Sequence, residues 1–543
     1  MKNNLTKLLP VATALSVIFS CGPADKPHEK PNIIVILADD MGYSDISPYG
    51  SEISTPTLQR LAEGGLLMTR FYNAARCCPS RASILTGLYP HQTGLAAMAD
   101  QRFDVEGYQG YLSKNSATIA EVLRPSGYRT YMSGKWHVGD IPGSKPHDRG
   151  FDRSYAFLNG ATSYYNIKPY RDSSWIERVG PIELTMELDG ENYIPPEDGF
   201  YSTDAYTDYA IKFIEEDLEK NKPFFLYLAY NAPHWPLQAP EEVVQKYLGK
   251  YTTGWDALRK QRFEKQKELG VIPPNSELSP SDPGWLNWDE FTEEEIERYD
   301  RKMAVYAAMI DRMDQNIGRL VEFLDETGEL NNTLIIFLSD NGGDRSDEIG
   351  HTNNYDKTGP IGSEKSFTGY GPGWANASNT PFRKYKARTF FGGIASPLVA
   401  WFPSYINSGD IVNCQGQIID LMPTILDYAG AEYPEEIDGN SIYRLPGISL
   451  RSIWEGELKQ RNEPLFFEHF GNRAVIYKEW KLVSDERQPW ELYNIIDDPV
   501  ELYNLIDSLP AKAVELEAIY NNWADSLEVL PIEDHEKHRI ERN

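Results

Sequence analysis

The chain has 543 residues, of which 41% are hydrophobic and 12% aromatic, and it carries a formal net charge of −28 at pH 7. This length exceeds one ordinary domain, so we expect one large domain and a smaller one, with enough apolar side chains for a sizeable core. The strongly negative charge argues against non-specific binding to nucleic acid. If the substrate is an anion, its binding site needs a local cluster of cations.

The N-terminus has the pattern of an export signal, in which two lysines precede an apolar stretch over residues 8–19. This stretch is too short to span a membrane comfortably. The segment that ends at Cys21 resembles the lipobox of bacterial lipoproteins, in which the cysteine is lipidated. We therefore expect a signal peptide over residues 1–20, a tether over residues 21–31, and a lipid-anchored protein in the periplasm or at the cell surface. An ordinary cleaved signal with an incidental Cys21 is the alternative.

Apolar runs rich in β-branched residues recur along the chain and predict strands buried on both faces of a parallel sheet. They cover residues 32–38, 68–73, 128–133, 223–230, 333–338 and 397–402. Helical patterns lie between them, over residues 55–63, 116–123, 204–219, 292–325 and 417–429. The longest of these helices begins with a capping box at Thr292. The alternation predicts an α/β fold with a large mixed, mostly parallel sheet sandwiched by helices.

The C-terminal part has a different pattern. Short strands over residues 473–484 and 490–493 precede a helix over residues 511–527. This order predicts a smaller α+β domain. We place the large domain at residues 32–444 and the small one at residues 445–543.

Polar residues follow the predicted strands at their carboxyl ends, where ligands bind in open parallel sheets. Asp39 and Asp40 follow the first strand, and Asp340 and Asn341 follow the strand over residues 333–338. One such pair is usually a turn or a helix cap. Two pairs on matching strand ends favour a cation, because clustered carboxylates repel one another without it. Their hard oxygen atoms suit Ca²⁺ or Mg²⁺ better than Zn²⁺.

Cationic and proton-donating residues occupy similar places. Lys135, His137 and His234 follow two other predicted strands. A basic cluster in the acidic chain comprises Arg383, Lys384, Lys386 and Arg388. Taken singly, these are ordinary solvated lysines and arginines or packing histidines. Together they are the local cations that an anionic substrate requires.

The stretch from Arg76 to Gly87 predicts a short helix with reactive groups at its start. Pro79 suits the first turn, and a helix N-terminus attracts anions. Cys77 lies just before that turn, and Arg81 follows about one turn later. A sulfur nucleophile and a cation at a helix start suggest chemistry on an anion. A buried cysteine pair that caps a helix is the alternative.

This stretch resembles the signature of the formylglycine-dependent sulfatases of the arylsulfatase type, in the residues Cys77-Cys78-Pro79-Ser80-Arg81 and Leu85-Thr86-Gly87. Other segments resemble further site segments of that family: Pro31 to Asp40, Gly134 to His137, Asn231 to Pro236 and Ser339 to Gly342. The resemblance implies an alkaline phosphatase-like fold and hydrolysis of sulfate monoesters, either aryl sulfates or sulfated carbohydrates.

The resemblance also implies a role for each matching residue. Cys77 is converted to formylglycine by a maturation enzyme, and the hydrate of this aldehyde attacks sulfur. Arg81 and Lys135 hold the hydrate and the sulfate, and His137 helps to break down the sulfated hydrate. Cys78 is then expected to be a buried structural residue.

His234 and Lys386 are implied to contact the sulfate and the leaving oxygen. Lys386 is placed by its spacing before a Gly-Gly pair, which Phe391 precedes where the family often has glutamate, and Lys384 competes for the role. One Ca²⁺ ion is implied to bind Asp39, Asp40, Asp340 and Asn341.

Two other functions remain open from the sequence. The same nucleophile and metal would suit a phosphate mono- or diester hydrolase, and an unmodified Cys77 would suit an inactive surface protein that binds sulfated glycans. Substrate specificity is expected in the loops over residues 139–202 and 344–380. The sequence also leaves open a bridge between Cys78 and Cys414.

Overall fold

A computed structural model describes residues 30–167, 185–196, 198–220, 222–281, 287–347, 359–458 and 460–540. The predicted signal peptide and the lipidated Cys21 lie outside these ranges, as do parts of the two expected specificity loops. Residues 31–543 form one compact unit. In the described part of the chain, no helix is both long and apolar enough to cross a bilayer.

The core of this unit is a ten-stranded sheet with the strand order β11-β2-β10-β9-β1-β8-β4-β5-β6-β7. Strands β1, β4, β5, β8 and β9 are parallel to their neighbours within that group, whereas β10 is antiparallel to both β9 and β2. The expected mixed, mostly parallel sheet is therefore confirmed. The strands comprise β1 (Asn32–Ala38), β2 (Leu66–Tyr72), β4 (Arg129–Lys135), β5 (Arg153–Phe157), β6 (Met186–Leu188), β7 (Glu191–Asn192), β8 (Phe224–Ala229), β9 (Thr333–Ser339), β10 (Ala395–Trp401) and β11 (Asp410–Gln417).

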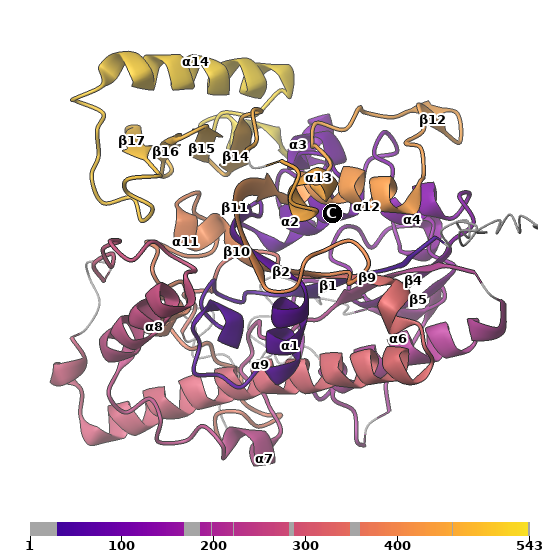
Figure 1. The fold of residues 1–543 in the computed structure, drawn as a ribbon, viewed down its shortest axis with the longest axis horizontal. Helices are drawn as coiled ribbons and strands as arrows, with labels where there is room; N and C mark the ends of the chain where they lie inside the picture. Colours follow the sequence, from indigo (N-terminus) through magenta and orange to yellow (C-terminus); the bar gives the residue numbers. More distant parts are fainter. Residues whose placement is uncertain are drawn as a thin grey trace, which may run out of the picture. The chain divides into compact units, whose positions relative to one another are not determined.

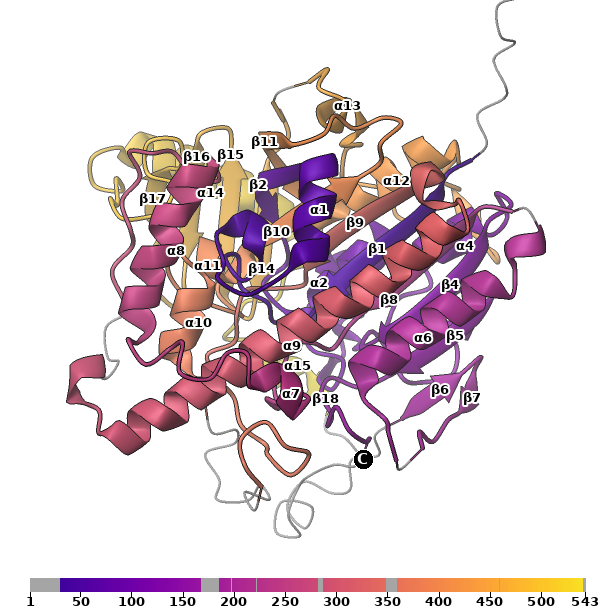
Figure 2. The same ribbon diagram turned by 60° about the horizontal axis from the view of Figure 1, so that its bottom comes forward.

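Helices cover both faces of the sheet, and the central strand β1 shows why (Figure 1). Its side chains alternate between two hydrophobic clusters, with Ile34 and Ile36 in one and Val35 and Leu37 in the other. Figure 2 shows α9 and α6 on one face of the sheet, and these helices share a hydrophobic cluster with Ile34 and Ile36. Helices on the two faces include α1 (Pro56–Gly64), α6 (Ser202–Glu215) and α9 (Glu293–Glu326), and α2 (Cys77–Thr86), α4 (Ile119–Leu123) and α12 (Leu421–Ala429).

A smaller antiparallel sheet forms the C-terminal domain, as expected. It contains β14 (Leu465–His469), β15 (Asn472–Tyr477), β16 (Trp480–Ser484) and β17 (Glu491–Asn494), in that order. Helix α14 (Pro510–Ser526) packs on this sheet through a cluster that includes Val475, Leu482 and Leu516. The boundary at residue 445 stays a prediction.

Several elements were not predicted from the sequence. They include β5, β11, β14 and the helix α8 (Trp255–Leu269). The residues of β11 alternate between exposed and partly buried over its first half, and α8 is rich in charged residues, so neither has an apolar run that marks it. β5 lies within the region expected to be a loop. Its sequence did not predict a strand, because it is short and begins with polar residues.

The remaining short elements connect these layers. The helices are α3 (Pro90–Thr93), α7 (Glu241–Val244), α10 (Pro372–Ser378), α11 (Phe391–Ile394), α13 (Arg451–Trp454) and α15 (His535–His538). The paired strands are β12 (Glu436–Ile437) with β13 (Asn440–Ser441), and β3 (Arg102–Phe103) with β18 (Arg539–Ile540).

Candidate active site

The polar residues expected at the carboxyl ends of the strands do meet at one edge of the sheet. β1 leads into Asp39 and Asp40, and its parallel neighbour β9 leads into Asp340. The backbone N–H of Asp40 donates to Asp340 Oδ1 over 3.2 Å, which ties the two strand ends together. All three carboxylates are at most 2% exposed.

Helix α2 begins at Cys77 itself, whereas the sequence pattern predicted that Cys77 lies just before the first turn, and the helix is capped by Gly87 with φ of 70°. This left-handed conformation suits glycine, and the Gly87 N–H closes the helix on the carbonyl of Ser83. Every residue from Cys77 to Thr86 is buried. Cys77 is therefore a buried residue at the first position of the helix.

Arg81 and Lys135 form ion pairs with two of the carboxylates. Lys135 Nζ lies 2.5 Å from Asp39 Oδ2, and Arg81 Nε lies 2.9 Å from Asp340 Oδ2. Arg81 also donates to the Lys135 carbonyl over 2.8 Å. All four side chains are fully buried. Arg81 lies about one helical turn after Cys77 on α2, and its guanidinium therefore reaches the carboxylates that follow β1 and β9.

Lys386 lies in the site, whereas its competitor Lys384 does not. Lys386 Nζ is 2.6 Å from Asp40 Oδ1 and 3.1 Å from Asp344 Oδ2. Burial lowers the pKa of Lys386, but these two carboxylates outweigh it and raise the pKa above its ordinary value. Lys384 instead lies 3.9 Å from Asp485 in the C-terminal domain.

The other two members of the basic cluster, Arg383 and Arg388, contact the C-terminal domain. Arg383 donates to the Glu501 carbonyl over 2.6 Å and so ties the site loop to the C-terminal domain. Arg388 donates to Asn472 Oδ1 over 2.8 Å and also lines the pocket described below. The four basic residues therefore do not gather as one cluster of cations in the site.

The oxygen atoms of this edge fit a cation. Asp39 Oδ1 and Asn341 Oδ1 are buried, and neither has a hydrogen-bond partner in the described structure. Asp39 and Asp40 also come together with His234, whose Nε2 lies 3.3 Å from Asp40 Oδ2. Burial and the neighbouring Asp39 raise the pKa of Asp340 to about 7, and the paired Arg81 only partly offsets them. The donor set suits a hard ion such as Ca²⁺.

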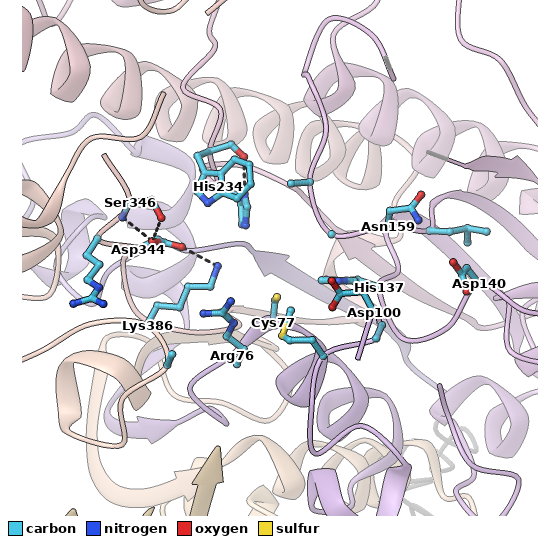
Figure 3. Close-up of a pocket in the computed structure, with 18 of the residues that line it drawn as sticks. Arg76, Cys77, Asp100, His137, Asp140, Asn159, His234, Asp344, Ser346 and Lys386 are labelled. Carbon is cyan, nitrogen blue, oxygen red and sulfur yellow. Dashed lines mark hydrogen bonds and ion pairs between the residues drawn. The ribbon is translucent and has the colours of Figure 1, made fainter. Parts of the chain in front are cut away.

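A pocket of about 410 Å³ opens beside Cys77. Figure 3 shows Cys77 in its middle, with Lys386 and Arg76 on one side and His137 and Asp140 on the other. Further lining residues include Asp100, Asn159, His234, Trp235, Asp344, Arg345, Ser346 and Arg388. This volume lies in the range of small-molecule sites.

The surroundings of Cys77 favour a reactive group. A hydrogen bond from Cys78, together with the cations Lys135 and Lys386, outweighs burial and holds the pKa of the Cys77 thiol well below its ordinary value. Burial and the adjacent Lys386 lower the pKa of His234 to about 3, so its ring is neutral.

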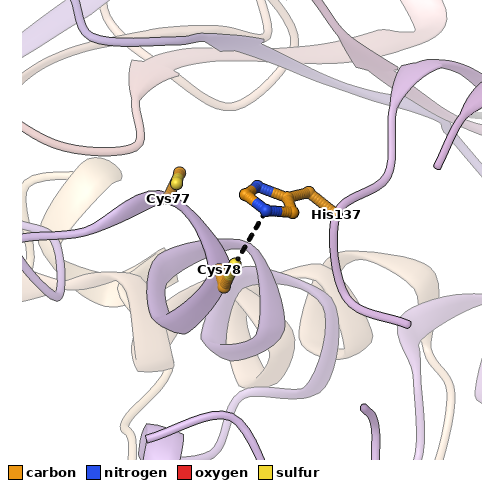
Figure 4. A group of neighbouring side chains, drawn as sticks. All are labelled: Cys77, Cys78 and His137. Carbon is orange, nitrogen blue, oxygen red and sulfur yellow. Dashed lines mark hydrogen bonds between the residues drawn. The ribbon is translucent and has the colours of Figure 1, made fainter. Parts of the chain in front are cut away.

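Cys78 has a contact that the sequence interpretation missed. It is fully buried, as expected, but its Sγ lies 3.2 Å from Nε2 of His137 (Figure 4). Cys414 is buried elsewhere, and all three described cysteines are free thiols, so the bridge between Cys78 and Cys414 is absent.

Arg76 and Asp344 also line the pocket and were not singled out from the sequence. Arg76 directly precedes Cys77, which is the only signal that marks it. Asp344 follows the Asp340 segment, and Lys386 and Arg76 outweigh its burial to lower its pKa. Both belong to the charge pattern around Cys77.

Comparisons with known proteins agree with this geometry. The family model named Sulfatase matches residues 31–431, and the model of the N-sulphoglucosamine sulphohydrolase C-terminal region matches residues 384–522. The chain belongs to the sulfatase family.

Relatives span most of this chain. An arylsulfatase of Klebsiella aerogenes is 36% identical over 84% of this chain and 98% of its own length. An uncharacterized sulfatase of Schizosaccharomyces pombe is 37% identical over 84% of this chain and 85% of its own. The crystal structure of Ps i-CgsB in complex with k-i-k-neocarrahexaose has a TM-score of 0.67 and 28% identity, covering 91% of this chain and 93% of that one. This sulfatase is accordingly a sulfuric ester hydrolase with an alkaline phosphatase-like fold.

Proposed function

We propose that this sulfatase hydrolyses sulfate monoesters of carbohydrates or aryl alcohols through a formylglycine at position 77 and one Ca²⁺ ion. The observation that carries the proposal is the place of Cys77. It begins α2, lines the pocket, and lies among Lys135, Lys386 and an oxygen-rich edge of the sheet. The glycan substrate is supported by the oligosaccharide in the Ps i-CgsB complex, and the aryl substrate by the relative from Klebsiella aerogenes.

The residues that would hold Ca²⁺ are Asp39, Asp40, Asp340 and Asn341. Asp39 and Asn341 each offer a buried oxygen without a hydrogen-bond partner in the described structure. When bound, the ion would supply Lewis-acid stabilisation of negative charge at the sulfate. His234 shares the Asp40 carboxylate with Lys386, which keeps both groups beside the ion site.

The remaining side chains would act on the substrate. Negative charge grows on the bridging oxygen as the ester bond breaks, by analogy with phosphoryl transfer. Lys386 is protonated and adjoins the pocket, so it can stabilise this oxygen or donate a proton to it. Arg81 and Lys135 are held in place by Asp340 and Asp39, which fixes their charge near residue 77. His137 would accept a proton there.

We further propose the export route expected from the sequence. A signal peptide over residues 1–20, lipid on Cys21 and a tether to residue 31 would anchor the enzyme at the membrane, in the periplasm or at the cell surface. A maturation enzyme would convert Cys77. Intact mass measurement of protein purified from a lipoprotein-competent bacterial host tests the anchor, because an unlipidated mature N-terminus contradicts it.

Mass spectrometry and kinetics test the catalytic proposal together. In a host with the maturation machinery, the peptide that contains Cys77 is expected to carry formylglycine. A matched pair of aryl sulfate and aryl phosphate esters then gives the reaction class, and the sulfate is expected to be hydrolysed faster. Faster phosphate hydrolysis would make the enzyme a phosphate esterase instead. An intact thiol without turnover would favour a protein that only binds sulfated glycans.

A further inference from the structure

The imidazole of His137 is held in one place by its neighbours. Its Nε2 lies 3.2 Å from Cys78 Sγ (Figure 4). On another side, a Cβ at Gly160 would lie 2.7 Å from Cε1 and 2.8 Å from Nε2, so only glycine lets the backbone come this close to the ring. His137 itself has φ of 57°, an unusual conformation for a residue with a side chain. The placement of this ring is therefore built by the fold.

The sulfur of Cys78 is surrounded by groups that define its hydrogen bonding. The backbone N–H of Ala99 donates to Sγ over 3.3 Å. Burial, and then the hydrogen bond with Cys77, raise the pKa of Cys78 well above its ordinary value, so it stays a thiol. The sulfur already accepts one hydrogen bond from Ala99 and can accept a second from another direction. The 3.2 Å contact with His137 Nε2 places the sulfur where it can accept a hydrogen bond from that nitrogen.

The two nitrogen atoms of His137 differ in their surroundings. Nε2 faces the Cys78 sulfur, whereas Nδ1 is buried and has no hydrogen-bond partner in the described part of the chain. His137 and Cys77 both line the pocket. A neutral imidazole carries its proton on one nitrogen only, and the partner of that nitrogen selects the tautomer.

We propose that Cys78 is a positioning residue that fixes the tautomer of His137: its sulfur accepts a hydrogen bond from Nε2–H and leaves Nδ1 as a base. This inference rests on the proposed function. A hydroxyl group at residue 77 can then lose its proton to Nδ1, with the O–H electron pair staying on oxygen and the new N–H bond forming on the imidazole. The second cysteine of the signature thus acts through His137 and does not touch the substrate.

A tautomer measurement tests this proposal without using activity. Long-range ¹H–¹⁵N spectra of histidine-labelled protein distinguish Nε2–H from Nδ1–H, and His137→Gln identifies the signal among the 9 histidines. The protein with an unmodified Cys77 serves for this purpose, because the contact is present there. We expect the Nε2–H form in the wild type and a mixture of tautomers in Cys78→Ala. The same single tautomer in both proteins would overturn the proposal.

Kinetics of the matured enzyme give a second readout. Cys78→Ala is expected to lower kcat on an aryl sulfate about tenfold or more with KM changed less than twofold, by analogy with the loss of groups that orient metal-bound histidines. Cys78→Ser keeps an acceptor and is expected to recover most of kcat. Cys414→Ala removes a buried thiol elsewhere and is the matched control, expected to match the wild type. An unchanged kcat in Cys78→Ala would overturn the proposal.

Two outcomes separate the possible failures. If Cys78→Ala does not fold, Cys78→Ser and Cys78→Val replace it, and equal kcat and equal tautomers in these two would contradict the role of the acceptor. If the wild type carries no formylglycine and hydrolyses no sulfate ester, the proposed function fails. The spectra of the unmodified protein still decide whether Cys78 sets the tautomer.

Discussion

Two regions of this protein contain buried ion pairs whose charges are matched differently. In the active site, Lys386 is shared by Asp40 and Asp344, and buried oxygen atoms such as Asp39 Oδ1 remain without a partner. In the C-terminal domain, Lys481 on β16 lies 2.5 Å from Glu501, and both side chains are fully buried. Glu501 also accepts a hydrogen bond from the Phe391 N–H over 2.9 Å.

This difference separates a site that keeps buried oxygen atoms such as Asp39 Oδ1 without a hydrogen-bond or ion-pair partner in the described structure from a pair whose two charges face each other. Buried oxygen atoms without a partner are unfavourable for the protein alone, because buried polar groups need hydrogen bonds or opposite charges to compensate for their lost hydration. A bound cation would supply such a partner. The Lys481–Glu501 pair sets one cation against one carboxylate, and Glu501 joins the C-terminal domain to α11. Changes in the first region should alter activity, and changes in the second should alter stability.

The largest effect is expected from Cys77→Ala. Removal of the nucleophile position should lower kcat about 10⁴-fold or more, as for other covalent nucleophiles. The melting temperature should change little, because alanine occupies the same helix start. Aryl sulfate turnover and thermal unfolding are measured side by side. Retention of full turnover would show that residue 77 is not the nucleophile.

Lys481→Met is the matching test in the other region. It leaves Glu501 buried without its cation, which should lower the free energy of unfolding by about 3–5 kcal/mol. The double variant Lys481→Met/Glu501→Gln should recover most of that loss. Turnover per folded molecule should remain that of the wild type. Denaturant unfolding measures the free energy, and active-site titration gives the turnover per folded molecule. A loss of turnover in the double variant would contradict a purely structural role for this pair.

The same pair makes a prediction about pH. Burial lowers the pKa of Lys481 to about 8 in the folded protein, from an ordinary value of 10.5. Between these values the unfolded state binds more protons, so this group adds stability as the pH rises from about 8 to 10.5. The double variant should lack this contribution. The difference between the two unfolding free energies across that pH range tests it, and parallel curves would be the contrary result.

Lys386→Met sharpens the assignment of the cation in the site. It should lower kcat about 10²-fold, the lower end of what a proton donor contributes. Lys384→Met is the control from the same loop, and it should leave kcat within about twofold because that side chain lies toward Asp485. Steady-state kinetics on one aryl sulfate compares them. If Lys384→Met had the larger effect, the role of Lys386 would pass to its neighbour.

Removal of the metal is expected to lower the free energy of unfolding less than the loss of the Lys481 cation does. At a hundredfold excess over its dissociation constant, a bound ion stabilises the folded state by about 2.7 kcal/mol. Chelation should therefore lower the melting temperature by a few degrees and abolish turnover, and Ca²⁺ should restore both. Asp340→Asn should weaken this response. A melting temperature that does not depend on Ca²⁺ would contradict the site.

Patterns local in the chain predicted much of the fold. The apolar run over residues 32–38 coincides with β1, because a strand buried on both faces needs apolar residues throughout. Thr292 and Glu295 form the expected capping box at the start of α9. By contrast, β11 and α8 owe their positions to neighbours in space, so no local run marked them.

The sequence by itself determined which residue types follow each strand, and thus that Asp39, Asp40, Asp340 and Asn341 would share one edge of the sheet. Parallel strands make this inference safe, because their carboxyl ends lie together. The tertiary structure alone decided between Lys386 and Lys384, since both lie in one loop and only the fold directs one toward Asp40. It alone brought Cys78 to His137, because contacts between residues 59 positions apart depend on how the elements pack.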